Sequence, residues 1–192
     1  MMRFLILCCV LLFGSFASVT EARPTAPMPA PAKAKIFLTV DEALALVFPD
    51  CEVEQRTAYL TKAERARVKK IGRVEVPQSM VRYYVGRKDG RLVGTAYIEA
   101  HKVRTLKETV LVLIDPEAKI RRFEILSFAE PTEYIPRDTW YAQLIGCGLE
   151  DDVELNRGIR GVSGATLTAR AATRSARRVL ALHSVLQVTV AE

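Results

Sequence analysis

Residues 81–100 read VRYYVGRKDGRLVGTAYIEA, and they carry the clearest structural signal in the chain. The run 81–86 is rich in β-branched and aromatic residues, which favour a strand. Lys88-Asp89-Gly90-Arg91 is typical of a hairpin turn. Residues 92–100 then return as a second strand, so this stretch predicts an antiparallel hairpin.

The same pattern continues toward the C-terminus. Residues 108–114 and residues 120–128 also have strand character, and Asp115-Pro116-Glu117-Ala118 forms a turn between them. The middle of the chain is therefore predicted to be an antiparallel meander.

Helix signals lie on both sides of this meander. Thr39 to Glu42 and Thr61 to Glu64 each match a capping box, and the two helices are expected to end at Pro49 and Gly72. A long helix is expected over residues 165–186. Helices followed by a meander and a last helix predict an α+β fold: an antiparallel sheet flanked by N-terminal helices and a long C-terminal helix.

The N-terminus has the features of a secretory signal. A short positive start is followed by an apolar run over residues 4–16 and then by small residues, so we expect residues 1–22 to be a signal peptide. An uncleaved anchor is the alternative. Residues 23–38 are rich in Pro and Ala, which predicts an extended linker, and residues 39–192 then form a single domain. The protein is expected to be exported across the cytoplasmic membrane, either periplasmic or anchored at its outer face.

Composition narrows the possible functions. The 192 residues include 28 Lys and Arg against 22 Asp and Glu, a net charge of +6 that favours acidic partners. Nucleic acid is not expected as a partner because the chain is exported. Two of the four cysteines lie in the leader, which disfavours a four-cysteine zinc site. The other two, Cys51 and Cys147, either form a disulfide or remain separate buried thiols.

The main chemical signal lies in residues 161–170, which read GVSGATLTAR. A glycine-bearing turn leads here into the start of the last helix. The first amides of a helix have no intrahelical acceptor, and the helix dipole favours an anion at this end. The segment therefore predicts a phosphate site, with an ordinary capped helix start as the alternative.

Ser163-Gly164-Ala165-Thr166, followed by Leu167-Thr168, resembles the flavinylation motif of the FMN-binding domain family. This family includes the C subunit of the Na⁺-translocating NADH:quinone reductase and the G subunit of the Rnf complex. The resemblance is strongest over residues 92–179. Two positions depart from the family pattern: Arg160 stands where an Asp is usual, and Pro131 replaces the Thr of a Glu-Thr pair.

The resemblance implies an electron-transfer protein or a subunit of a redox complex, rather than a stand-alone enzyme. It implies FMN as cofactor, joined through a phosphoester to Thr166 by an FMN transferase. The redox partner would be a cytochrome, a ferredoxin-like protein or a membrane reductase subunit. The further candidate cofactor-binding residues are Ser163, Gly164, Ala165, Thr168, Arg170, Glu130 and Trp140.

The last helix also suggests a docking surface. Helical spacing places Arg170, Arg174, Arg177 and Arg178 in one sector, beside an apolar sector with Leu167, Val179, Leu182 and Leu186. This basic stripe is either a surface for an acidic partner or a solvated face. Two other functions stay open: a basic module without flavin that docks on an acidic polymer or a membrane surface, and a protein that binds FMN without covalent attachment.

Overall fold

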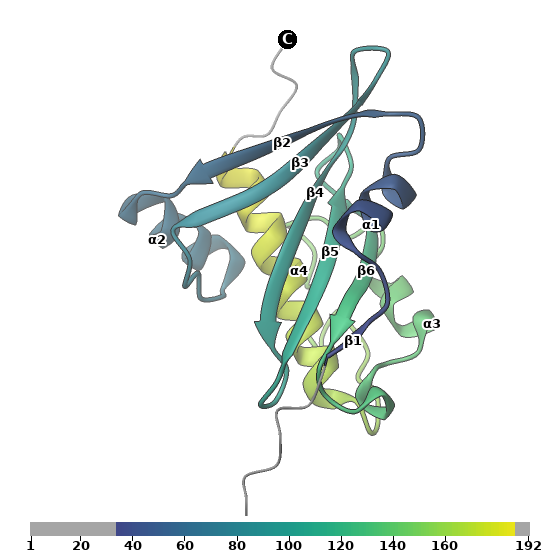
Figure 1. Ribbon diagram of the computed structural model, residues 1–192. Coiled ribbons are helices and arrows are strands. Elements are labelled where there is room, and N and C mark those ends of the chain that lie inside the picture. The colour runs from purple at the N-terminus through teal and green to yellow at the C-terminus, as the bar shows by residue number, and fades with distance from the viewer. Residues whose placement is uncertain (1–33, 187–192) are drawn as a thin grey trace, which may run out of the picture. The chain divides into compact units, whose positions relative to one another are not determined.

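The computed structural model describes residues 34–186 and shows an α+β fold with a six-stranded antiparallel sheet (Figure 1). The fold class predicted from the sequence is thereby confirmed. The predicted signal peptide and most of the predicted linker lie outside the described residues. Among residues 34–186, no helix is both long and apolar enough to cross a membrane.

The sheet has the strand order β1-β6-β5-β4-β3-β2, and all neighbouring strands are antiparallel. The β3–β4 hairpin turns at Asp89 and Gly90, whose φ angles of 51° and 74° are left-handed. Such a turn matches the right-handed twist of the two strands. The strands are β1 (Lys35–Ile36), β2 (Glu52–Tyr59), β3 (Met80–Lys88), β4 (Arg91–Lys102), β5 (Lys107–Ile114) and β6 (Ile120–Phe128).

Two of these strands are not expected from the sequence. The short strand β1 lies within the predicted linker and pairs with the end of β6. The edge strand β2 pairs with β3 along its whole length. Most of its side chains are exposed, so it lacks the apolar alternation by which a half-buried strand is recognised.

The helices agree closely with the sequence signals. Thr39 caps α1 (Val40–Val47) and Thr61 caps α2 (Lys62–Gly72), each through a complete capping box. The last helix, α4, covers Thr166–Leu186. Between β6 and α4 the chain forms three short helices: η1 (Thr132–Tyr134), α3 (Asp138–Tyr141) and η2 (Ala142–Leu144).

Two hydrophobic clusters cover opposite faces of the sheet. On β5, Val110 and Val112 belong to the cluster that includes α4, whereas Leu111 and Leu113 belong to the cluster that includes α1. Successive strand residues point to opposite faces, so this central strand is buried on both sides. Figure 1 shows α4 behind the sheet and α1 in front of it.

The two cysteines do not form a disulfide. Cys51 packs against the α1 cluster and Cys147 packs against the α4 cluster, so the thiols are associated with opposite sheet faces. Each thiol instead donates to a nearby main-chain carbonyl, that of Pro49 and that of Gln143 respectively. Of the two alternatives open from the sequence, the structure has the separate thiols.

Candidate functional site

The candidate site is built around the first turn of α4. Gly164 has a φ angle of 81°, a left-handed conformation that favours glycine, and it brings the chain to the helix start. The first intrahelical hydrogen bond runs from the Ala169 N–H to the Ala165 carbonyl, at 2.9 Å. Thr166 is the first helical residue and is exposed. Its hydroxyl donates to the Val162 carbonyl at 3.0 Å, which orients the side chain.

The loop before α4 is held by side chains from the short helices. The Trp140 indole Nε1 donates to the Arg160 carbonyl at 2.7 Å. The Gln143 Oε1 accepts from the Arg160 main-chain N–H at 3.0 Å and from its side-chain Nε at 3.3 Å. Arg160 is therefore pinned through both of its main-chain polar groups. This role of Gln143 has no signal in the sequence, because the two residues meet only in the folded chain.

A cleft of about 720 Å³ opens between this loop and the short helices. This volume falls within the range of roughly 300–1,000 Å³ that is typical of small-molecule sites. Ser163 and Ala165 of the motif contribute to its wall, as does Trp140. The remaining lining residues are Glu133, Ile135, Pro136, Arg137, Thr139, Gln143, Arg160, Gly161 and Val162.

Trp140 forms part of the wall of this cleft rather than an exposed ring on which a ligand could stack. Its side chain is buried in the α4 cluster and meets Tyr141 edge-on, with ring centroids 5.0 Å apart. The structure thus places Trp140 on the same cleft as Ser163 and Ala165 of the motif. The packing of the indole inside the core leaves only part of it to face the cleft.

Thr168 and Arg170 are placed differently from Thr166. Thr168 is fully buried, and its hydroxyl has no hydrogen-bond partner in the described part of the chain. A cofactor bound outside the helix cannot reach that hydroxyl. Arg170 is exposed one turn beyond Thr166, on the same side of α4, and lines a second groove together with Arg73, the residue that follows α2.

Glu130 has a structural role at a hairpin. Its Oε1 accepts hydrogen bonds from the main-chain N–H groups of Thr105 and Leu106, at 2.7 and 2.8 Å, and from the Thr105 hydroxyl. These bonds hold the β4–β5 turn and lower the pKa of Glu130 below its usual value. Glu130 therefore holds this turn through its Oε1, and its predicted contact with a cofactor stays a prediction.

The basic stripe on α4 is only partly exposed. Arg174 and Arg170 face solvent, but Arg177 is buried and Arg178 is half-buried. Arg177 donates to the Gly72 carbonyl, and Arg178 bonds the Glu75 carbonyl and the Glu99 carboxylate. The predicted apolar sector of α4 is also not wholly buried, because Leu167, one of its members, is 46% exposed. Helical periodicity places residues on one side of a helix, but it does not show that α2 packs against that side.

No group of three or more His, Cys, Asp or Glu suited to a metal ion is found within residues 34–186. No protein-family model, curated protein or solved structure matches this chain. The functional interpretation therefore rests on the motif residues and on the geometry around them.

Proposed function

We propose that this protein is an exported flavoprotein electron carrier that binds FMN at the start of α4. In the sharper form of the proposal, the cofactor is joined through a phosphoester to Thr166. The observation that carries it is the exposure of Thr166 next to a ligand-sized cleft: Ser163 and Ala165 line this cleft, and Thr166 directly follows Ala165. A residue that must be modified by a transferase needs this accessibility.

The phosphate end of FMN has suitable surroundings at this position. The amides of the first turn of α4 have no carbonyl four residues earlier within the helix, so they are free to face an anion. The Arg170 side chain lies one turn further along the same side of α4 and is exposed. Both features would stabilise the negative charge that a phosphoester keeps after attachment.

The ring end of FMN would lie in the cleft. Apolar groups of Ile135, Val162 and Trp140 contribute to its lining, and they suit one face of an aromatic ring. Bound FMN supplies one- and two-electron transfer, while the chain holds and orients it. Such a carrier needs an FMN transferase for maturation. It also needs a redox partner outside the cytoplasm, a cytochrome, a ferredoxin-like protein or a membrane reductase subunit.

The test is attachment of the cofactor in vivo. The full-length protein is co-expressed with an FMN transferase, and a denaturing gel is viewed under ultraviolet light. We expect a fluorescent band for the wild type and none for Thr166→Ala. The matched control is Thr168→Val, which is buried, nearly isosteric and loses only an unpartnered hydroxyl, so its band should remain. If the wild-type band is not fluorescent although the transferase labels a control flavoprotein, covalent attachment is refuted.

One observation favours a second function, a flavin-free basic module that docks on an acidic polymer or membrane surface. Arg73, just after α2, lines a common groove with the α4 residues Arg170 and Arg174, and Arg170 is also proposed to face the phosphate of FMN. Absorbance separates the possibilities. A purified protein with no absorbance in the blue, even after incubation with FMN, would favour the basic module. A yellow Thr166→Ala variant would instead indicate FMN bound without attachment.

A further inference from the structure

Five arginines line one groove between the C-terminal end of α2, the loop over residues 152–157 and the N-terminal half of α4. The groove has a volume of about 440 Å³. Its arginines are Arg73, Arg157, Arg170, Arg174 and Arg177. They come from three separate segments, so only the folded chain brings them together.

The carboxylates at this groove do not balance its arginines. Asp152 pairs with Arg73 at 3.6 Å and with Arg157 at 3.0 Å, and Glu154 pairs with Arg157 at 3.3 Å. Within residues 34–186, Arg170 and Arg174 have no carboxylate within ion-pair distance. Five arginines against two carboxylates leave an excess of three positive charges around a small volume.

Arg177 shows that this is a built site rather than a solvated face. Its side chain is only 6% exposed, and its Nε is anchored on the Gly72 carbonyl at 2.7 Å. Burial lowers the pKa of Arg177 and the charge of Arg73 lowers it further, while the carboxylates of Glu154 and Asp152 partly oppose this. A buried cation among other cations is unfavourable unless an anion compensates it. An anion in the groove would be attracted by all five side chains.

We infer that this arginine groove binds a polyvalent phosphoryl anion, of the size and charge of a diphosphate group. The planar guanidinium presents paired N–H donors that match two phosphate oxygens, which makes arginine suited to such ligands. Arg170 and Arg174 are four residues apart on α4 and exposed, so they reach the groove from the same side. The excess of three charges matches a diphosphate better than a singly charged anion. The inference does not depend on flavin attachment to Thr166.

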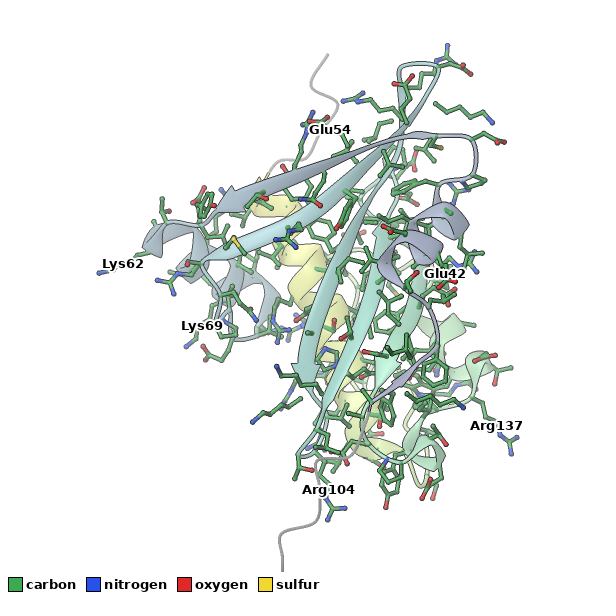
Figure 2. The ribbon with its side chains drawn as sticks, in the orientation of Figure 1. Glu42, Glu54, Lys62, Lys69, Arg104 and Arg137 are labelled. Atoms are coloured by element: carbon green, nitrogen blue, oxygen red, sulfur yellow. The ribbon has the colours of Figure 1, made fainter. Side chains whose placement is uncertain are left out.

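The test is calorimetric titration of inorganic diphosphate into flavin-free full-length protein at physiological salt. We expect one ion per chain. Arg170→Gln with Arg174→Gln should weaken binding by about tenfold or more, because two charge-assisted contacts are lost. The matched control is Arg67→Gln with Arg104→Gln, which removes the same charge from exposed arginines on α2 and at the β4–β5 turn. Figure 2 shows Arg104 pointing away from the sheet at that turn. The affinity of this control variant for diphosphate should stay within about twofold of the wild type.

Four results would overturn the inference. The first is no heat of binding, and the second is an equal loss of affinity in the groove variant and in the control. The third is sulfate, a dianion, binding as tightly as diphosphate, which would show that the second phosphoryl group is not recognised. The fourth is saturable binding of poly-glutamate without binding of diphosphate, which would make the groove a docking surface for acidic protein. Thr166→Ala should bind diphosphate like the wild type, so failure of this inference is distinguishable from failure of flavin attachment.

Discussion

The Nε of Arg177, in the middle of α4, donates a hydrogen bond of 2.7 Å to the main-chain carbonyl of Gly72, the last residue of α2. The last carbonyls of a helix have no partner within the helix, so this bond satisfies one of them. The two helices approach closely at this point. A Cβ atom added at Gly72 would lie 2.9 Å from the Ala181 Cβ and 3.3 Å from the Arg177 carbonyl oxygen.

This close approach predicts an unusual response to Gly72→Ala. A glycine-to-alanine change in a helix normally stabilises it, but here the added methyl group meets α4. We expect the free energy of unfolding to fall by about 1–3 kcal/mol, as measured by urea denaturation. Ala181→Gly removes the opposing methyl group, so the double variant should lose less stability than the sum of the two single variants. Strict additivity would show that the two methyl groups do not compete for the same space.

The bond from Trp140 to the Arg160 carbonyl predicts that Trp140→Phe destabilises the loop before α4. The change removes the only donor that the indole has and leaves a smaller side chain in the core, at a cost of about 1–3 kcal/mol. Amide exchange of residues 159–165 should become faster. The matched control is Tyr141→Phe, since the buried Tyr141 hydroxyl has no partner within the described residues. Its unfolding free energy should be unchanged or higher, and an equal loss in both variants would contradict the assigned role of the indole bond.

Arg160 stands three residues before Ser163, where the flavinylation motif that this segment resembles usually has an Asp. If the transferase reads this side chain, Arg160→Asp should raise the flavinylated fraction when transferase is limiting. The main-chain bonds of Arg160 to Trp140 and Gln143 are kept in this variant, because they do not involve its side chain. Arg137 also lines the cleft, so Arg137→Asp makes the same charge change there and serves as the control. Equal labelling of all three proteins would mean that the transferase does not read position 160.

His183 predicts a specific dependence of stability on pH. Burial beside the Tyr97 hydroxyl, 3.1 Å from its Nδ1, lowers the pKa of His183 from 6.5 to about 4. The imidazole of His183 binds a proton more readily in the unfolded chain than in the folded one. Its contribution to the free energy of unfolding is therefore complete above pH 6.5 and is lost as the pH falls from 6.5 toward 4. The loss should reach about 3 kcal/mol. In His183→Asn this part of the pH dependence should disappear from denaturation curves, and an unchanged slope would show that other groups cause it.

The sequence alone predicts the elements whose signals are local. The capping boxes at Thr39 and Thr61 and the Asp89-Gly90 turn lie within a few residues of the bonds that they form, and all three occur as predicted. The edge strand β2 could not be predicted, because its exposed polar side chains carry no periodic pattern and its pairing partner β3 lies beyond α2. The position of Thr166 at the start of α4 is likewise a local property, because a turn through Gly164 precedes it.

Tertiary structure decided which of the polar residues around that helix are accessible. Thr166 and Thr168 are two residues apart, yet Thr166 is exposed and Thr168 is buried. Residues two apart on a helix face nearly opposite sides, and one of those sides packs on the sheet. Arg177 and Arg174 carry the same charge, but the packing of α2 buries only Arg177. Local spacing determines the direction in which a side chain points. Burial and charge clustering depend on segments that are distant in the sequence, because packing and electrostatic interactions act through space.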